Sequence, residues 1–257
     1  MAEHWYCPKT GRPRHFNASG RPTSLREART EELCPSSTSI QGSIAKPALE
    51  KWIKKNLVNS AFSNPPINGE SPESYFRRIQ SIAYQQTGEA AEYGTAFHKA
   101  AEDYFNGEPL DPKFEKQLKP IIEWKEKKQI EFLKLEHTFA TPKHGFGGTI
   151  DIVATNPKGA KLIIDYKTRK SKPGEKMRPY GLEVTQLASY AVGYWGQEAV
   201  ENEECHGVNI FVSSTEPGRV EIHGYKPCEM LQGWRFFQSI AECWFNLRNY
   251  DPRQKWP

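Results

Sequence analysis

The stretch from Phe146 to Lys170 constrains the fold most strongly, because it predicts two strands joined by a tight turn. Both halves carry the aliphatic and β-branched residues that favour a buried or half-buried strand. These residues are Ile150, Ile152 and Val153, followed by Leu162, Ile163 and Ile164. Between them, the Asn-Pro-Lys-Gly segment at 156–159 is typical of a turn, since proline fixes φ and glycine allows positive φ. We therefore expect an antiparallel hairpin.

Two acidic side chains and a lysine lie on this hairpin. Asp151 falls on the first strand, and Asp165 and Lys167 fall on the second, where a spacing of two places both side chains on one face. Tyr166 points the other way, while its backbone carbonyl stays near the carboxylates. Carboxylates bind divalent cations and an ammonium group orients or activates water, so this set predicts a metal-dependent phosphodiesterase. The alternative is an ordinary hairpin with solvent-facing charges, although strands disfavour an aspartate at position 165.

Helical periodicity, capping residues and Pro/Gly breaks predict the remaining elements. Helices are expected over 25–33, 46–58, 71–86, 89–105, 111–133, 182–198 and 228–249, and further strands over 135–141, 208–213 and 219–225. This order indicates an α/β (α+β) fold, in which helices flank a central mixed sheet. With 257 residues, of which 12% are aromatic, we expect a single domain over 1–257. Its parts are an irregular N-terminal segment at 1–35, a mainly helical part at 36–134 that carries His98, and a sheet with helices at 135–257.

The composition limits the function classes. The net charge is only +4, so any nucleic-acid contact must be a local patch. No apolar run approaches the ~20 residues that span a bilayer and no hydrophobic signal core occurs, so we expect a cytoplasmic protein without membrane contact. The Gly-x-x-x-x-Gly-Lys-Ser/Thr phosphate loop is missing, which excludes a helicase or ATPase module and a nucleotide cofactor. The five cysteines are scattered, which indicates neither a zinc ribbon nor a disulfide framework.

Three polar residues on predicted helices are ambiguous by themselves. His98 lies at the edge of an apolar helical stripe, where a histidine is more often packed in the core than bound to a metal. Gln186 and Tyr190 are one turn apart and share a helix face, which is unremarkable alone. A further carboxylate, Glu136, opens the strand before the hairpin and is a candidate for a second-metal or supporting carboxylate.

Four short motifs occur in one order along the chain. They are Gly-Thr-x-x-His at 94–98, Gly-x-x-Asp at 148–151, Asp-x-Lys-Thr at 165–168 and Gln-x-x-x-Tyr at 186–190. Together they resemble the RecB-type branch of the PD-(D/E)XK nucleases. Single-domain members of that branch include phage and viral exonucleases and a mitochondrial genome-maintenance exonuclease. The resemblance extends from about Arg21 to Tyr190.

The resemblance implies a restriction-endonuclease-like core and a role for each matching residue. His98, Asp151, Asp165 and the backbone carbonyl of Tyr166 would ligate Mg²⁺ or Mn²⁺. Lys167 would position or activate the attacking water, and Gln186 and Tyr190 would orient that lysine and the DNA. The implied activity is a metal-dependent DNA exonuclease that acts on DNA ends, in recombination, repair or phage genome processing.

A basic segment follows the second strand of the hairpin and is the candidate for gripping DNA phosphates. With Thr168, its members are Arg169, Lys170, Lys172, Lys176 and Arg178. The alternative is a solvated charged loop. The expected partner is linear DNA with single-stranded ends in a bacterial or phage-infected cell, with a recombinase or single-strand-binding protein as a candidate partner. A structure- or site-specific endonuclease and a non-catalytic nucleic-acid-binding protein are the alternative functions.

Overall fold

The structure, a computed structural model, describes residues 3–45 and 47–255. Its residues form two compact units, which we call unit 1 (Met1–Ile44 with Ala100–Pro257) and unit 2 (Ala45–Lys99). The expectation of a single nuclease domain over 1–257 stays a prediction. Over the described residues, the helices are all too short or too polar to span a bilayer.

Unit 1 is built on a five-stranded sheet with the order β3-β4-β5-β6-β7. The strands are β3 Glu131–Thr141, β4 Phe146–Thr155, β5 Lys161–Arg169, β6 Cys205–Ser213 and β7 Val220–Tyr225. All neighbours pair antiparallel except β5 and β6, which are parallel. A parallel pair needs a long connection, and the helices α6 Glu183–Trp195 and α7 Gln197–Glu201 supply it. The predicted α+β fold with a mixed sheet flanked by helices is therefore confirmed.

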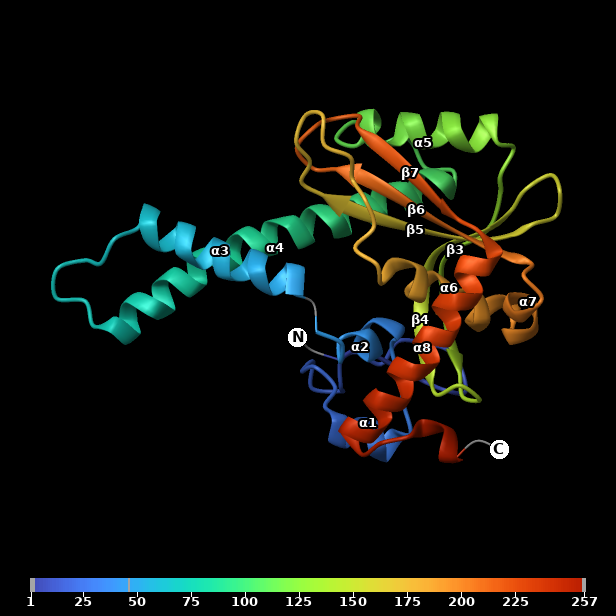
Figure 1. Cartoon of the computed structure of the whole chain (residues 1–257), viewed down its shortest axis with the longest axis horizontal. Helices are drawn as coiled ribbons and strands as arrows, with labels where there is room; N and C mark the ends of the chain where they lie inside the picture. Colours follow the sequence, from blue (N-terminus) through green and yellow to red (C-terminus); the bar gives the residue numbers. More distant parts are fainter. Residues whose placement is uncertain (1–2, 46, 256–257) are drawn as a thin grey trace. The chain divides into compact units, whose positions relative to one another are not determined.

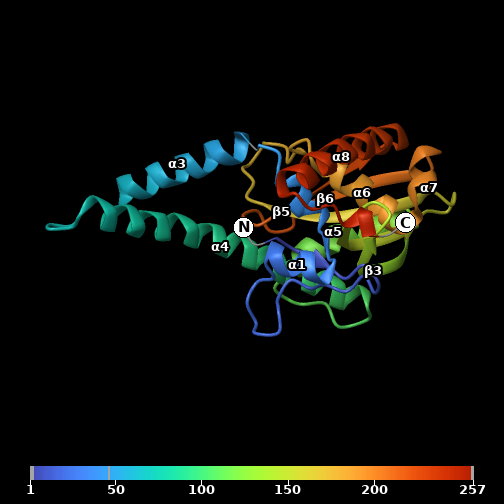
Figure 2. The same cartoon turned by 90° about the horizontal axis from the view of Figure 1, so that it is seen from below.

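Helices cover both faces of this sheet (Figures 1 and 2). Helix α6 packs on one face together with α8 Pro227–Arg248, and α5 Glu115–Lys127 lies on the other. The core on the α6 side is rich in aromatic rings: Phe146 packs edge-on against Phe139 and Phe237, with ring centroids 5.9 Å and 4.8 Å apart. Burial of such rings supplies most of the free energy that holds the helices on the sheet.

The N-terminal segment is more ordered than predicted. Strands β1 Trp5–Tyr6 and β2 Cys34–Pro35 form a small antiparallel sheet. Helix α1 Leu25–Glu31 lies within the helix predicted at 25–33, whereas α2 Ser37–Gln41 was not predicted. Trp5 is fully buried, and its indole N–H donates to the Thr23 carbonyl at 3.1 Å. The segment therefore belongs to the core of unit 1, which its Gly/Pro-rich composition did not indicate.

Unit 2 consists of α3 Pro47–Ser63 and most of α4 Pro72–Phe105, whose last turns from Ala100 belong to unit 1. The prediction of two helices at 71–86 and 89–105 is wrong, because α4 continues through Gly88. A single glycine costs about 1 kcal/mol relative to alanine but keeps its N–H, so it does not end a helix. Within unit 2, the Tyr75 hydroxyl donates to the Ala61 carbonyl at 3.1 Å and Arg78 pairs with Glu70 at 2.8 Å.

Other predicted boundaries are also wrong. The helix predicted at 46–58 continues to Ser63, and Lys46 lies outside the described residues. The helix predicted at 111–133 begins at Glu115 and ends at Lys127, after which Gln129 adopts a φ of +52° and Glu131 starts β3. The Lys/Glu pattern there is compatible with a helix, but pairing of Glu131 with Thr155 draws this segment into the sheet. The helix predicted at 182–198 ends at Trp195, because Gly196 has a φ of +88°.

We predict that Gly193→Ala destabilises unit 1 by about 1–3 kcal/mol through overpacking. Gly193 lies on α6, and an added Cβ would overlap the ring of Phe139, which is itself wedged edge-on against Tyr190 at 6.0 Å. At an open helical position, a change from glycine to alanine would stabilise the protein by about 1 kcal/mol. The sign of the change in the free energy of unfolding therefore tests the prediction. Gly224→Ala in β7 is the control, since no atom lies within 4 Å of its added Cβ. Chemical unfolding of both variants measures the difference.

Candidate active site

The strands β4 and β5 separate at the predicted acidic positions. Their pairing runs from Thr155–Lys161 to Ile152–Ile164 and stops there. Beyond that point, the Tyr166 N–H donates to Oδ2 of Asp151 at 2.7 Å. The Asp151 carboxylate thus takes the acceptor position that a strand carbonyl would otherwise fill, which fixes its orientation. In an antiparallel strand the N–H and C=O of one residue face the same side, so the Tyr166 carbonyl also faces Asp151.

Asp165 and Lys167 lie in contact on the α6 side of β5. Asp165 is 3% exposed, and its Oδ2 lies 2.6 Å from Nζ of Lys167. Burial acts to lower the pKa of Lys167, but the carboxylates of Asp165 and Asp151 raise it more, so the pKa lies above its ordinary value. The ammonium group is therefore charged at neutral pH. A permanent cation suits the orientation of water and the neutralisation of phosphate charge better than it suits proton abstraction.

Helix α6 also contacts Lys167, in addition to the contact of this lysine with Asp165 on β5. Nζ of Lys167 donates to Oε1 of Gln186 at 3.0 Å, and Nε2 of Gln186 donates to the Tyr190 hydroxyl at 2.7 Å. Burial, with the nearby Asp165 carboxylate, raises the pKa of Tyr190 well above its ordinary value, so the phenol stays neutral. The structure thus brings together Lys167, Gln186 and Tyr190, as the sequence motif suggested, and their catalytic roles stay predictions.

Two residues of this network were missed in the sequence. Asn209 on β6 is fully buried, and its Nδ2 donates to Oδ2 of Asp165 at 3.0 Å. The Tyr225 hydroxyl on β7 donates to Oδ1 of Asn209 at 3.0 Å. Asp165 is thereby held by Asn209 of the neighbouring strand β6 and by Lys167 of its own strand, and Tyr225 fixes Asn209 in turn. The only signal in the sequence is an asparagine inside the apolar run at 208–212.

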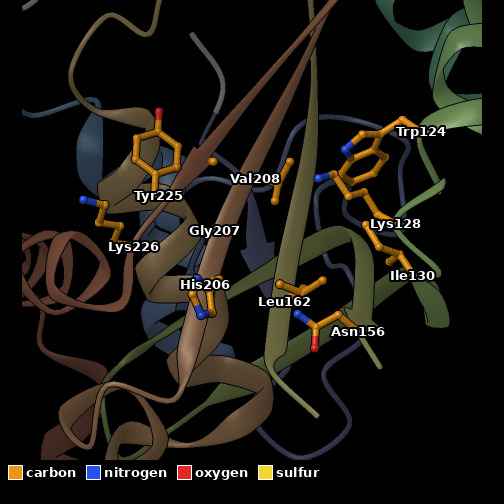
Figure 3. A pocket seen from close by; sticks show the side chains of 11 residues that line it. Trp124, Lys128, Ile130, Asn156, Leu162, His206, Gly207, Val208, Tyr225 and Lys226 are labelled. Atoms are coloured by element: carbon orange, nitrogen blue, oxygen red, sulfur yellow. The ribbon is translucent and has the colours of Figure 1, made fainter. Parts of the chain in front are cut away.

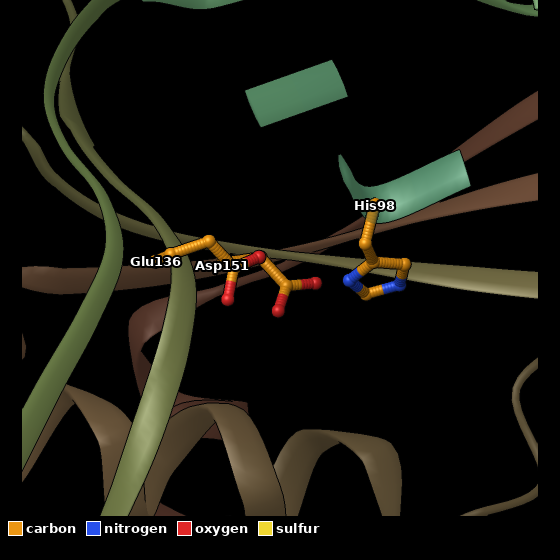
Figure 4. A group of neighbouring side chains, drawn as sticks. All are labelled: His98, Glu136 and Asp151. Carbon is orange, nitrogen blue, oxygen red and sulfur yellow. The ribbon is translucent and has the colours of Figure 1, made fainter. Parts of the chain in front are cut away.

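Glu136 faces the Asp151 side of this site through an unusual backbone. The register of β3 passes from Leu135–Ile152 to His137–Ile150, so Glu136 stands opposite Asp151. Its φ is +43°, a left-handed conformation that is rare for a non-glycine residue inside a strand. Such strain costs on the order of 1–3 kcal/mol and persists where the surroundings enforce it, often at functional sites. The left-handed turn directs the Glu136 carboxylate toward Asp151 (Figure 4).

Glu136 and Asp151 of unit 1 are candidate metal ligands (Figure 4), and His98, which belongs to unit 2, stays a predicted third ligand. His98 lies on α4, two residues before the turns that belong to unit 1. A carboxylate oxygen of Glu136 lies within 4.8 Å of a carboxylate oxygen of Asp151. Two carboxylates and an imidazole suit Mn²⁺, and the carboxylates suit Mg²⁺. Asp165 lies outside this group, where Lys167 and Asn209 hold it, so ligation of a metal by Asp165 stays a prediction.

The N-terminal segment also reaches this site, which no sequence motif indicated. The Tyr6 hydroxyl shares a hydrogen bond with Oγ1 of Thr149 at 2.9 Å, two residues before Asp151 on β4. Burial raises the pKa of Tyr6, and the Glu136 carboxylate raises it further despite the hydrogen bond with Thr149. Tyr6 thus lies in the electrostatic field of the acidic group as a neutral phenol.

The predicted basic segment divides into one half-buried and several exposed cations. Arg169 is ion-paired with Glu183 at the start of α6 and donates to the Arg178 carbonyl at 2.5 Å. Its guanidinium therefore ties the loop 170–181 to α6. The exposed cations are Lys170, Lys172, Lys176 and Arg178, while Thr168 is partly buried. Contact of these residues with DNA stays a prediction.

A cavity of about 310 Å³ lies on the α5 side of the sheet (Figure 3). Trp124 and Lys128 of α5 line it together with Leu162 of β5 and His206 and Val208 of β6. Because Leu162 and Asp165 are an odd number of residues apart on one strand, they point to opposite faces. None of the predicted site residues lines this cavity.

Comparison with known proteins does not assign the chain to a family. No family model matches it, and no curated protein matches it. Among solved structures, the crystal structure of SSO0001 aligns with a TM-score of 0.33 at 15% identity, over 80% of this chain and 89% of that chain. A TM-score of this size is too low to relate the two molecules in function.

Proposed function

We propose that this protein is a metal-dependent DNA exonuclease that hydrolyses phosphodiester bonds from DNA ends. The observation that carries the proposal is the joint placement of Asp151, Asp165 and Lys167 where β4 and β5 separate, with Gln186 bound to the lysine. Buried carboxylates beside a charged lysine have no structural need to gather at the open end of a hairpin. The order of the four sequence motifs supports membership in the RecB-type PD-(D/E)XK nucleases.

Mg²⁺ or Mn²⁺ is the proposed cofactor. Asp151, Glu136 and His98 would hold the ion, joined by the Tyr166 carbonyl and by Asp165. A bound divalent cation would supply a water of lowered pKa and a positive charge for the phosphate oxygens.

Each remaining residue of the site has a task that follows from its contacts. Lys167 would donate hydrogen bonds to the attacking water or to a phosphate oxygen, and its raised pKa keeps it charged while it does so. Asp165 and Gln186 hold the ammonium in place from two directions. The ammonium group only donates, so the amide oxygen of Gln186 faces the lysine, and the Tyr190 hydroxyl accepts from the amide nitrogen.

The exonuclease assignment is tested with DNA substrates that differ only in their ends. The purified protein is incubated with Mg²⁺ or Mn²⁺ and with linear or covalently closed circular DNA of one sequence, and 5′- or 3′-end-labelled single and double strands report the direction. We expect linear DNA to be degraded, circular DNA to survive and EDTA to stop the reaction. Cutting of the circle would favour a structure- or site-specific endonuclease instead. Binding without turnover in either metal would favour a non-catalytic nucleic-acid-binding protein.

A role in DNA recombination, repair or phage genome processing, in the cytoplasm of a bacterium or a phage-infected cell, follows from this activity. A nuclease that leaves single-stranded ends supplies the substrate of recombinases and single-strand-binding proteins, which makes either a candidate partner. Co-purification of the full chain with such a protein in the presence of linear DNA tests this role.

A further inference from the structure

Tyr180 is a solvent-exposed aromatic residue with a fixed backbone. It lies in the loop 170–181 between β5 and α6, and 77% of its surface is exposed. Its N–H donates to Oε2 of Glu183 at 2.8 Å, which ties the loop to the first turn of α6. The ring therefore projects into solvent from an anchored position.

One face of the Tyr180 ring is covered by a cation that is itself held in place. The guanidinium carbon of Arg169 lies 3.9 Å from the Tyr180 ring centroid and 4.4 Å from that of Phe211. Glu183 and the Arg178 carbonyl bind the same guanidinium. With one face against Arg169, an exposed fraction of 77% leaves the opposite face of Tyr180 open. A ring fixed in this way loses little conformational entropy when a planar ligand stacks on it.

The position of this ring relates it to the candidate active site. Asp165, Lys167 and Arg169 are spaced by two along β5, so their side chains leave one face in a row. Two residues of a strand cover about 6.8 Å, so Arg169 lies that far along the strand from Lys167. Each strand of duplex DNA rises about 3.4 Å per nucleotide, so about 6.8 Å corresponds to two nucleotide steps. Tyr180, above Arg169, is thus placed for a base one or two nucleotides from a phosphate at Lys167.

We propose that Tyr180 is a stacking platform for an unpaired nucleobase of the DNA strand that enters the active site. The loop 170–181 has four cationic side chains against one carboxylate, Glu175, so it attracts a polyanion. Stacking on an open aromatic face is how proteins hold single strands without reading sequence. This inference rests on the proposed nuclease function for its substrate, and it adds a contact that selects unpaired over paired ends.

The test measures binding without turnover, in EDTA, so that it does not depend on nuclease activity. The probe is a single-stranded oligonucleotide with 2-aminopurine near its end, and a second oligonucleotide carries an abasic residue at that position. We expect Tyr180→Ala to weaken binding of the first probe about tenfold to a hundredfold and to abolish its fluorescence quenching. Tyr180→Trp should keep both. The abasic probe should bind equally to the unsubstituted protein and Tyr180→Ala, because it has no base to stack.

Phe16→Ala is the matched control, since Phe16 is also a loop aromatic, with 64% of its surface exposed. It should leave both affinities unchanged. Equal binding of the 2-aminopurine probe by Tyr180→Ala and the unsubstituted protein would overturn the proposal, and so would an equal loss for both probes. Thermal unfolding of each variant shows that the fold is kept. If the protein degrades no DNA but Tyr180 still supports base-dependent binding, the proposed nuclease function is overturned and the stacking site is not.

Discussion

Replacing Lys167 with alanine is expected to slow metal-dependent degradation of DNA about a hundredfold to a thousandfold. The ammonium group is the only side-chain cation that contacts both Asp165 and Gln186 among the described residues, and its charge would offset the negative charge that develops on the phosphate. Loss of one positioned donor in a site of this kind has an effect of that size on the rate. Initial rates on end-labelled linear DNA with Mg²⁺ and with Mn²⁺ measure it.

Two further variants separate chemistry from folding in this experiment. Lys167→Ala leaves the buried Asp165 carboxylate without its cation, which destabilises the protein, whereas Lys167→Gln removes the charge but keeps a polar N–H donor beside Asp165. Both should slow degradation about a hundredfold to a thousandfold. Lys158→Ala is the control, because Lys158 is an exposed lysine in the turn at 156–159, at the opposite end of the hairpin. Full activity in folded Lys167→Gln would remove the lysine from the mechanism.

The second large effect is expected from Asp151→Asn, which should abolish divalent-cation binding and activity together. Asparagine keeps an oxygen acceptor for the Tyr166 N–H at the position of Oδ2, so the backbone around the site is preserved. It removes the charge that faces Glu136, the other carboxylate of the candidate metal site in unit 1. Changes to residues that merely support a metal ligand weaken binding about tenfold to a hundredfold, and a ligand itself should have at least that effect.

Thermal unfolding with increasing Mn²⁺ measures this loss directly. A cation that binds only the folded protein stabilises it by about 2.7 kcal/mol at a concentration one hundred times its dissociation constant. The unsubstituted protein should gain stability with Mn²⁺, and Asp151→Asn should not. Glu204→Gln serves as the control, because Glu204 forms an exposed ion pair with Lys161 at the other end of β5. The same Mn²⁺-dependent gain in Asp151→Asn would contradict a site at this aspartate.

Local patterns predicted the parts of the molecule that local forces determine. The hairpin around 156–159 follows from aliphatic runs and a Pro/Gly turn, and Gly159 has a φ of +76° there. The spacing of Asp165 and Lys167 placed them on one face because side chains alternate in every strand. By contrast, the helix boundary near Lys127 was set by pairing with a distant strand, which no local window contains.

The missed members of the site share one property: their partners are distant in sequence. Asn209 contacts Asp165 through the parallel pairing of β5 and β6, and Tyr6 contacts Thr149 through the packing of an N-terminal strand on β4. Nothing in their neighbourhoods marks them as functional. The left-handed backbone of Glu136 is likewise invisible in sequence, because glutamate has no preference for it.

The most direct measurement is the position of Mn²⁺ in crystals of this protein, located by its anomalous scattering. We expect a single strong peak within about 2.5 Å of carboxylate oxygens from Asp151 and Glu136, with the His98 imidazole as a further ligand. Crystals of Asp151→Asn, measured in the same way, should lack that peak. A Mn²⁺ ion bound elsewhere, with none between these side chains at millimolar concentration, would contradict the metal site on which the proposed function depends.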